Sequence, residues 1–342
     1  LEHAFDPFEQ VKHRIQALEA VGHPTDKIEL LILGGTWSAY RRDYQEWFLR
    51  RCFEAMNGAQ AETLEQAMRI NETTAHRNVG LVIETRPDEI NPHELVWLRH
   101  LGVTKLQMGA QSLDDRILAL NERGHTLADT HRAVALLRAA GFKIVLHWMP
   151  NLLGATPESD REDFLRLWQG LCPDEIKIYP TQLLANADLY AYWQRGEYQP
   201  YTTPELVGLI ADIKPSIPRH CRVNRVIRDI PSTNVVEGNK RTSLRMDVQE
   251  EMLRRGTVCA CIRCREVRKQ TVSREALRLD DLVYYADGID PASACEEHFL
   301  SFVTPDDRIA GFLRLSLPQQ SAASLGLTDL HAAAIIREVH VY

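Results

Sequence analysis

The stretch that decides the fold is KIVLHWMPN at residues 143–151. Its first six residues form an apolar, β-rich run, and Pro150 follows two residues after its end. Similar runs occur before residue 230, at residues 28–33, 79–83, 104–108, 175–179 and 221–226. Amphipathic stretches with helical spacing separate them, at residues 44–56, 64–76, 94–101, 126–140, 161–171 and 204–213. This alternation predicts a parallel sheet covered by helices.

The number of strand–helix units narrows the fold class. Six such units are too many for a flavodoxin-like sheet and too few for a closed eight-stranded barrel. The sequence therefore predicts an α/β fold in which residues 1–255 form a partial (β/α)6 barrel of the TIM type. Beyond residue 268 the pattern changes to short strands with little helix between them, at residues 282–285, 298–302, 310–316 and 335–341. They predict an antiparallel second domain over residues 297–342, a linker over residues 256–296 and a hairpin loop over residues 319–327.

The charge of the chain is distributed unevenly. The 342 residues carry a net charge of −7, which taken alone argues against a nucleic-acid partner. Residues 214–269, however, contain 14 Lys or Arg against 6 Asp or Glu, so this segment is at +8 and the remainder at −15. The sequence contains no run of roughly 18 apolar residues and no secretory signal pattern. We therefore expect no membrane association and a cytoplasmic location.

Polar residues and glycines follow five consecutive predicted strands. Ligands bind at the carboxyl ends of the strands in parallel α/β folds, so these positions predict an active-site mouth. For Glu84 and Arg86 the alternative is a buried ion pair, and for His147 it is a satisfied core residue. The candidate residues are, strand by strand, Gly34, Gly35 and Thr36; Glu84 and Arg86; Gln107 and Gln111; His147; and Lys177 and Tyr179.

The basic segment contains a second candidate site. Its cations predict a phosphate-binding surface, with a merely solvated face as the alternative. The cations that we assign to it are Arg222, Arg225, Arg228, Lys240, Arg241 and Arg245. Aromatic residues precede the segment and fit either base stacking or the packing of a surface helix, at Tyr190, Tyr192, Trp193, Tyr198 and Tyr201.

Three cysteines lie close together in the linker. Cys259, Cys261 and Cys264 form a CxCxxC pattern that suits a tetrahedral metal, with zinc as the first choice. Cys295 is the best candidate for the fourth ligand, and His298 is the other. The alternatives are an iron–sulfur cluster on the same thiolates or three reduced cysteines without a metal.

Several longer stretches, taken in order, resemble one family. They include GHPTDKIELLILGGTW at 22–37, VIETRPDEI at 82–90, LQMGAQSLDD at 106–115, NERGHT at 121–126, HWMPNLLGATPE at 147–158, DEIKIYPT at 174–181 and REVHVY at 337–342. Together they are similar to the catalytic subunit of the Elongator complex, a radical S-adenosylmethionine enzyme fused to a GNAT-type acetyltransferase domain. The resemblance implies an enzyme that forms 5-carboxymethyluridine at the wobble uridine, position 34 of tRNA. Its cofactors would be a 4Fe-4S cluster, S-adenosylmethionine, acetyl-CoA and zinc.

The resemblance also implies roles for individual residues. Lys27 matches an acetyl-CoA-contacting lysine, and Glu338, Val339, His340 and Val341 match the acetyl-CoA-binding strand. The S-adenosylmethionine cavity would be lined by Gly34, Gly35, Thr36, Glu84, Arg86, Gln107, Gln111 and His147. Catalytic roles fall to Lys27, Glu84, Gln111, Lys177 and Tyr179.

The sequence departs from the family at both ends. The family's cluster cysteines would precede Leu1 and its pyrophosphate loop would follow Tyr342, so we expect the cluster ligands to lie outside this chain and the acetyltransferase domain to be incomplete. On that basis this chain alone is expected to be inactive. The alternative functions are a protein that binds tRNA and acetyl-CoA without radical chemistry, or a protein lysine acetyltransferase. A homodimer or an assembly with accessory subunits is compatible with each of these functions.

Overall fold

The computed structural model describes residues 3–342 apart from 229, 269, 287–294, 318–324 and 331–332. Most of the hairpin loop predicted at residues 319–327 therefore lies outside the described residues. The chain divides into two compact units. The first comprises Leu1–Thr85 and Pro92–Gln107, and the second comprises Arg86–Asn91 and Met108–Tyr342. The predicted domain boundaries at residues 255 and 296 stay a prediction.

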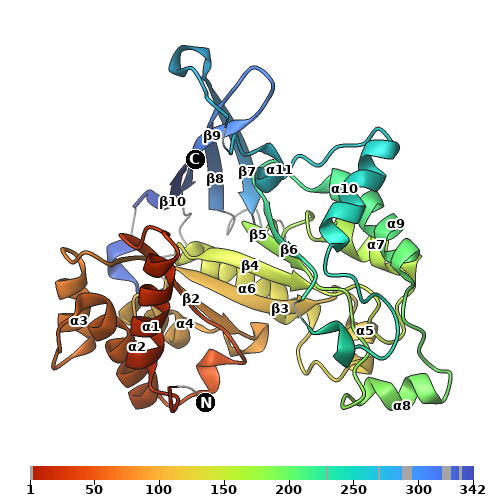
Figure 1. Ribbon diagram of the computed structural model, residues 1–342, viewed down its shortest axis with the longest axis horizontal. Helices are drawn as coiled ribbons and strands as arrows, with labels where there is room; N and C mark the ends of the chain where they lie inside the picture. Colours follow the sequence, from red (N-terminus) through yellow and green to blue (C-terminus); the bar gives the residue numbers. More distant parts are fainter. Residues whose placement is uncertain (1–2, 229, 269, 287–294, 318–324, 331–332) are drawn as a thin grey trace. The chain divides into compact units, whose positions relative to one another are not determined.

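The strands predicted before residue 230 all form, and they belong to one six-stranded sheet in the order β1-β2-β3-β4-β5-β6. Neighbouring strands are parallel in the pairs β1–β2, β4–β5 and β5–β6, and Figure 1 shows β4, β5 and β6 side by side. A parallel sheet whose strands follow the chain order is a half-barrel, which confirms the predicted α/β partial barrel. The strands are β1 (Lys27–Ile32), β2 (Arg77–Thr85), β3 (Lys105–Gln111), β4 (Lys143–Trp148), β5 (Glu175–Ile178) and β6 (Arg222–Val226).

The described residues of the first unit form four α-helices and the first strands of the sheet. Its helices are α1 (Pro7–Ala20), α2 (Arg42–Asn57), α3 (Leu64–Asn71) and α4 (Pro92–His100). Trp97 of α4 donates its indole N–H to Gln45 of α2 at 2.6 Å. Helix α1 was not predicted, because only Pro7 and Ile15 are buried on it and an apolar stripe is lacking. Asp6 instead marks its start by accepting a hydrogen bond from the backbone N–H of Phe8.

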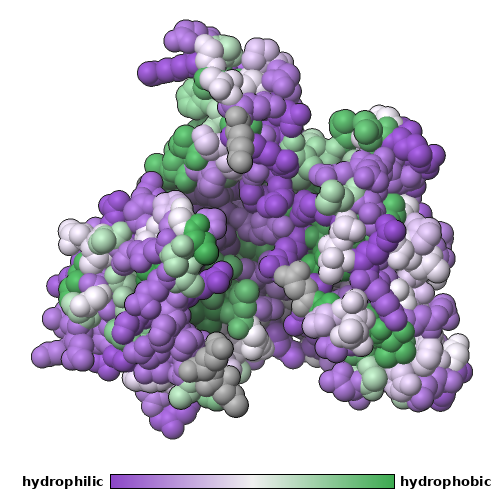
Figure 2. All heavy atoms as spheres, in the orientation of Figure 1, coloured by the Kyte–Doolittle hydropathy of each residue, from purple (hydrophilic) through white to green (hydrophobic). Residues whose placement is uncertain are grey.

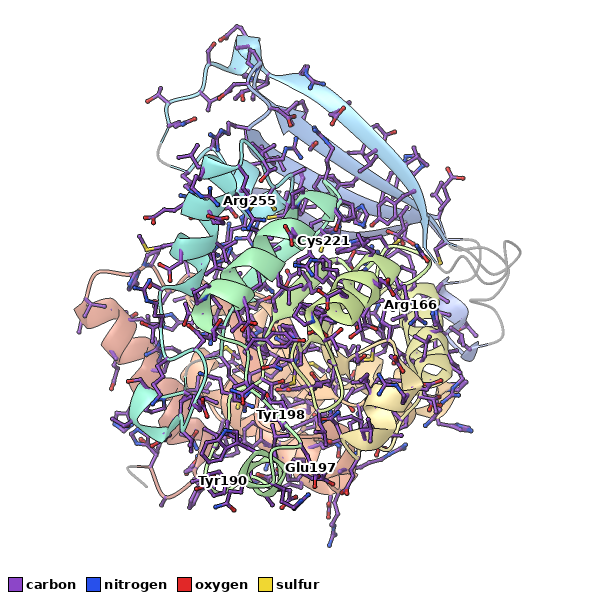
Figure 3. The ribbon with its side chains drawn as sticks, turned by 90° about the vertical axis from the view of Figure 1, so that its right-hand side faces the viewer. Arg166, Tyr190, Glu197, Tyr198, Cys221 and Arg255 are labelled. Atoms are coloured by element: carbon purple, nitrogen blue, oxygen red, sulfur yellow. The ribbon has the colours of Figure 1, made fainter. Side chains whose placement is uncertain are left out.

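The second unit holds the remaining helices of the half-barrel. Capping boxes begin α6, α7 and α9, and each helix starts one residue after its N-cap, which is Thr126, Thr156 or Thr202. Arg255, just after α10, forms an ion pair with Asp212 of α9 at 2.5 Å (Figure 3). The helices are α5 (Asp115–Leu120), α6 (Leu127–Ala139), α7 (Pro157–Arg166), α8 (Leu189–Gln194), α9 (Thr203–Ile213), α10 (Leu244–Arg254) and α11 (Ile262–Arg265).

The strands predicted after residue 268 form a four-stranded antiparallel sheet in the order β10-β9-β8-β7. Three are longer than predicted, namely β7 (Arg278–Ala286), β8 (Cys295–Val303) and β9 (Ile309–Leu317), whereas β10 (Ile335–Val341) has the predicted bounds. One face packs on Ile262 of α11 through Phe299, Val303, Ile309 and Phe312. The GNAT identity of this sheet stays a prediction.

The face of the molecule shown in Figure 2 is mainly polar. Hydrophilic side chains cover most of the face shown in Figure 2, with apolar groups between them. Within the described residues, no helix combines the length and the apolarity that a membrane span requires.

Candidate active site and metal centre

Three strand ends of the second unit form a polar mouth. Gln111 ends β3 in a left-handed backbone conformation with φ 65°, and its carbonyl accepts a hydrogen bond from the Met149 N–H at 2.8 Å. A Cβ atom on Gly109 would lie 2.4 Å from the side-chain nitrogen of Gln111. The Gln111 amide therefore occupies the space that only a glycine leaves free.

His147, Lys177 and Tyr179 come together at the ends of β4 and β5. His147 and Lys177 are register partners, the rings of His147 and Tyr179 lie 5.4 Å apart, and the Lys177 ammonium lies 5.7 Å from the centre of the Tyr179 ring. Burial, together with Lys177 and Arg228, lowers the pKa of His147 to about 3. His147 is therefore a neutral imidazole at physiological pH. In this form one ring nitrogen donates a hydrogen bond and the other accepts one.

Arg123 and His125 belong to the same mouth, although sequence reasoning gave them no role. Both lie in the loop after α5, and the structure buries the Arg123 Nε and the His125 Nδ1 without a hydrogen-bond partner among the described residues. The other ring nitrogen of His125 lies 3.3 Å from the Ala110 carbonyl. Burial lowers the pKa of both side chains. The available signal was the NERGHT stretch, which does not follow a strand and so escaped a search of strand ends.

Further buried polar atoms at the mouth also lack partners within the described part of the chain. They are Gln111 Oε1, Thr181 Oγ1 and Gln182 Oε1. Unsatisfied buried polar groups cost about 1–3 kcal/mol each, so a polar ligand that pairs with them is the expected explanation. Arg86 differs, because its guanidinium is held by Asp88 at 2.8 and 2.9 Å.

The first unit carries the other predicted cavity residues. Gly34 and Gly35 have φ values of 119° and 131°, which favour glycine, and a Cβ on either would meet no atom within 4 Å. The loop that follows them is tied to the end of β2 by a hydrogen bond of 2.9 Å between Ser38 and Thr85. Thr36 belongs to this loop, whereas Glu84 lies in the last part of β2 and Gln107, buried, in β3.

Lys27 is not brought to this end of β1. It is the first residue of β1 and lies opposite Arg77, so the length of the strand, roughly 20 Å, separates it from Gly34. Both cations line a hollow of about 510 Å³ at the amino ends of β1 and β2. The proposed acetyl-CoA contact of Lys27 stays a prediction.

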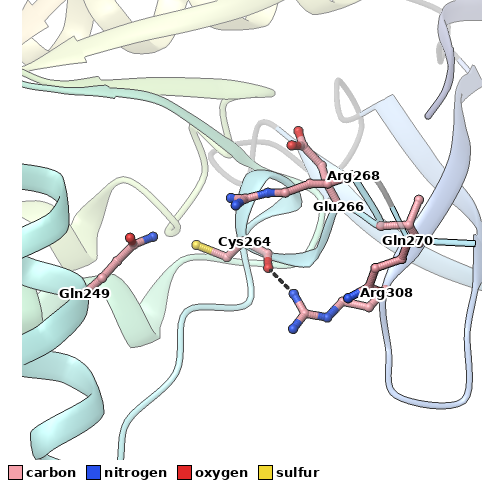
Figure 4. Close-up of a pocket in the computed structure, with 7 residues that line it drawn as sticks. Gln249, Cys264, Glu266, Arg268, Gln270 and Arg308 are labelled. Carbon is pink, nitrogen blue, oxygen red and sulfur yellow. Dashed lines mark hydrogen bonds between the residues drawn. The ribbon is translucent and has the colours of Figure 1, made fainter.

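The three linker cysteines form a compact group. The sulfur atoms of Cys259, Cys261 and Cys264 all lie within 4.8 Å of one another, and no other such group of metal-ligating side chains occurs in the described parts of the chain. A tetrahedral site with Zn–S bonds of about 2.3 Å places its sulfurs about 3.8 Å apart, so this triad fits. Cys264 also lines a hollow of about 510 Å³ with Arg268, and Arg308 donates to the Cys264 carbonyl at 3.0 Å (Figure 4).

The two candidates for a fourth ligand lie elsewhere. Cys295 begins β8 opposite Ala286, is buried, and is not part of the cysteine group. His298 is engaged by Asp281 at 3.1 Å and by Glu296 at 3.0 Å. The structure therefore unites three of the four predicted ligands.

The basic segment separates into internal and exposed cations. Arg222 pairs with Glu266 and donates to the Tyr342 hydroxyl at 2.8 Å, and Arg245 donates to the Val223 carbonyl at 3.1 Å. These two side chains stabilise the fold through contacts within the protein, because β6 and α10 direct them inward. The exposed cations are Arg225, Arg228, Lys240 and Arg241.

The aromatic residues before this segment mainly pack against the protein. Tyr198 donates to the Asn151 carbonyl at 3.0 Å and Tyr201 to the Asp160 carboxylate at 3.0 Å, and both are buried. Tyr190, Tyr192 and Trp193 pack on the cluster that contains Tyr198. Figure 3 labels Tyr190 and Tyr198. Of the two interpretations, base stacking or packing within the protein, the second therefore holds for Tyr198 and Tyr201.

Sequence comparison identifies the family. The radical SAM superfamily profile matches residues 5–167, and the profile of the radical SAM C-terminal domain matches residues 173–254. The chain is 41% identical over 345 residues to the tRNA uridine(34) acetyltransferase of Dehalococcoides mccartyi (strain CBDB1), covering 99% of this chain and 73% of that protein. The chain belongs to the tRNA uridine(34) acetyltransferase, or Elp3, family.

Other members of the Elp3 family support the assignment. Human Elongator complex protein 3 is 33% identical over 341 residues, which are 99% of this chain and 62% of that protein. The protein from Methanocaldococcus jannaschii is 41% identical, over 92% of this chain and 59% of its own length. The solved structure of an N-terminally deleted Elp3 from Methanocaldococcus infernus superposes with a TM-score of 0.91 at 38% identity, covering 100% of this chain and 80% of that one. The chain thus spans less than two thirds of two of these relatives, the human and the Methanocaldococcus jannaschii proteins. The resemblance seen in the sequence is confirmed.

Proposed function

We propose that this chain is the radical S-adenosylmethionine part of an enzyme that converts the wobble uridine of tRNA, at position 34, to 5-carboxymethyluridine with acetyl-CoA. The observation that carries the proposal is the mouth of buried polar groups around neutral His147, Lys177 and Tyr179, in a chain of the Elp3 family. S-adenosylmethionine bound to a 4Fe-4S cluster supplies a carbon-centred radical in such enzymes. We place this activity in the cytoplasm, with accessory subunits or a homodimer as possible assemblies.

In this proposal some residues of the mouth bind S-adenosylmethionine and others orient the substrates. Gln111, Arg123 and His125 offer unpaired acceptors and a cation, which suits the zwitterionic amino-acid end of S-adenosylmethionine. Lys177 and Tyr179 orient the substrates beside the neutral His147. The proposal assigns no cluster ligands within the described residues, because their one cysteine triad follows β6.

The test is product formation by the protein expressed from its complete reading frame. Anaerobic reconstitution with iron and sulfide, followed by labelled acetyl-CoA, S-adenosylmethionine and tRNA, is expected to give labelled 5-carboxymethyluridine on mass spectrometry. Label on protein lysines with none on tRNA would favour a protein lysine acetyltransferase. Binding of tRNA and acetyl-CoA without product would favour the binding protein.

For the linker we propose a zinc ion held by Cys259, Cys261 and Cys264, with Cys295 or His298 as the fourth ligand. The support is the proximity of the three sulfurs and the cations that act on them, Arg245 and Lys214. Lys214 is buried, and its Nζ has no hydrogen-bond partner in the described residues. Three thiolates and Zn²⁺ carry a net negative charge, which a buried ammonium offsets.

Replacing Cys261 by serine is expected to remove this metal. The wild-type chain should retain about one zinc ion per molecule after dialysis against a weak chelator, and the C261S variant less than about a tenth of that, because a structural site needs its full thiolate set. Atomic emission spectroscopy measures the stoichiometry. The C52S variant, which alters a buried thiol outside the group, is the control and should retain zinc. Full zinc in C261S would remove the proposed site.

Reversing the exposed cations is expected to weaken tRNA binding. The R225E/R241E double variant should lower the affinity for tRNA and reduce the slope of log K against log salt by about 1–2, because each cation that contacts a phosphate releases about one counterion. R69E, in a solvent-exposed ion pair with Glu65 on α3, is the matched control. Fluorescence anisotropy over a salt series gives both quantities. An unchanged slope would place the tRNA surface elsewhere.

A further inference from the structure

A buried ionic network joins β10 to the amino ends of β4 and β5 within the second unit. Its ion pairs connect cations and carboxylates in equal number, so its net charge is zero. The cations are Arg138, Lys143, Arg314 and Arg337, and the carboxylates are Asp174, Glu175, Glu297 and Glu338. The network lies at the end of the barrel strands opposite to His147 and Lys177.

Arg337 is the residue of β10 that departs from the regular strand. Ile336 lies opposite Leu315 and Glu338 lies opposite Arg314, so Arg337 is the extra residue of a β-bulge in the described register. Successive side chains of a regular strand point to opposite faces. Here two successive side chains, those of Arg337 and Glu338, both reach the network.

The contacts of Arg337 hold this bulge firmly. Its guanidinium pairs with both oxygens of Asp174 at 2.7 and 2.9 Å, with Glu297 at 2.5 Å, and with the Phe142 carbonyl at 3.1 Å. Its side chain has no exposed surface. A bidentate, fully buried arginine fixes both the position and the orientation of the backbone that carries it.

Glu338 ties the next residue of β10 to the barrel. Its two carboxylate oxygens contact Lys143 at 2.6 Å and Arg314 at 2.8 Å. Burial alone would raise the pKa of Glu338, but Lys143 and Arg314 hold it below its usual value. The carboxylate is therefore ionised and keeps both partners at neutral pH.

The bulge immediately precedes the stretch that we assign to acetyl-CoA. β10 is an edge strand of its sheet in the described structure, so the backbone groups on its outer side are not paired with another strand of that sheet. A backbone N–H group on that side can donate a hydrogen bond to a carbonyl oxygen such as that of an acetyl group. Lys143 and Asp174 lie only four and three residues before His147 and Lys177 along the chain.

We propose that Arg337 is a positioning residue for acetyl-CoA: it holds the bulge of β10 and so sets the backbone of residues 338–341 against strands β4 and β5. This proposal rests on the proposed role of residues 338–341 in binding acetyl-CoA. Arg337 does not touch the substrate, and it acts through the backbone that follows it.

The test compares two arginines that share one carboxylate. Arg337→Met and Arg138→Met each remove a buried guanidinium from Asp174, but Arg138 lies on α6 and Arg337 on β10. Isothermal titration of the full-length protein is expected to show an acetyl-CoA Kd raised at least about 10-fold in R337M and changed less than about twofold in R138M. Amide hydrogen exchange of residues 338–341 should rise in R337M alone.

Milder variants keep the test decisive if R337M fails to fold. Arg337→Lys retains the charge and should recover part of the affinity, and Glu297→Gln weakens the hold on Arg337 while leaving its pair with Asp174. E297Q should raise the Kd about 2- to 5-fold.

Equal effects of the Arg337 and Arg138 variants on the acetyl-CoA Kd would overturn the proposal while leaving the proposed function intact. Failure of the wild-type protein to bind acetyl-CoA at all would instead remove the proposed role of residues 338–341, and this inference with it.

Discussion

Replacing Asp174 by asparagine is expected to lower the free energy of unfolding by about 3–5 kcal/mol. The Asp174 carboxylate is fully buried and pairs with Arg138, Arg314 and Arg337 at 2.7–3.3 Å. It also accepts the backbone N–H of Ile144 at 2.9 Å. An amide in its place leaves three buried guanidinium groups with an excess of positive charge, and water cannot solvate them. Urea unfolding followed by circular dichroism measures the change.

The matched control is Asp212→Asn. Asp212 also pairs with two arginines, Arg161 and Arg255, but its side chain is 37% exposed. Ion pairs at such positions contribute about 0–1 kcal/mol, because solvent screens them. A loss in D174N no larger than the loss in D212N would contradict the stabilising role of the network.

The same variant is expected to change the acid limb of the stability curve. Burial alone would raise the pKa of Asp174, but Arg138, Arg337 and Arg314 hold it well below the ordinary value. An aspartate with a depressed folded-state pKa stabilises the protein fully above its unfolded pKa of about 3.9, and this stabilisation is lost as the pH falls toward the folded-state value. The difference in stability between wild type and D174N should therefore be largest above about pH 5 and shrink below about pH 4. A difference that stays constant down to pH 3 would show that the charge of Asp174 is not its source.

The half-barrel was predictable because its strands are short apolar runs that local pattern alone defines. Residues 143–148, for example, form β4 with the predicted bounds. Helix α1 was not predictable from hydrophobic periodicity, because a helix with only two buried residues has no continuous apolar stripe along one face. The cysteine triad was found because its three ligands lie within six residues of one another.

The ionic network escaped sequence reasoning for the opposite reason. Arg337 and Asp174 are 163 residues apart, and nothing in their local sequence indicates that they pair. The bulge at Arg337 also breaks the alternation from which a face would be assigned, so REVHVY looks like an ordinary strand. Among the basic residues, Arg222 and Arg245 look the same in sequence as the exposed Arg225, and only burial separates them.

Replacing Arg123 by methionine is expected to raise the Kd for S-adenosylmethionine by about 10- to 100-fold, because a hydrogen bond to a charged group contributes about 1.5–3 kcal/mol. Arg123 has a buried Nε without a partner, and the structure shows no ion pair for its guanidinium among the described residues. Burial and the nearby Arg86 lower the pKa of Arg123, and the carboxylate of Asp88 offsets this only in part. The anionic carboxylate of S-adenosylmethionine is the group that would compensate it. Equilibrium dialysis with the reconstituted protein measures the Kd.

The stability of the same variant separates this role from a structural one. The carboxylate nearest in charge to Arg123, Asp88, is already paired with Arg86. The half-buried Arg123 cation therefore costs free energy in the absence of ligand, and R123M should be as stable as wild type or more stable. Arg132→Met, which removes an exposed partner of Asp129 on α6, is the control and should change neither the Kd nor the stability by more than about 0.5 kcal/mol. A less stable R123M variant that binds S-adenosylmethionine normally would assign Arg123 to the fold. A variant with weaker binding and undiminished stability would show that the mouth keeps an unpaired charge for its ligand.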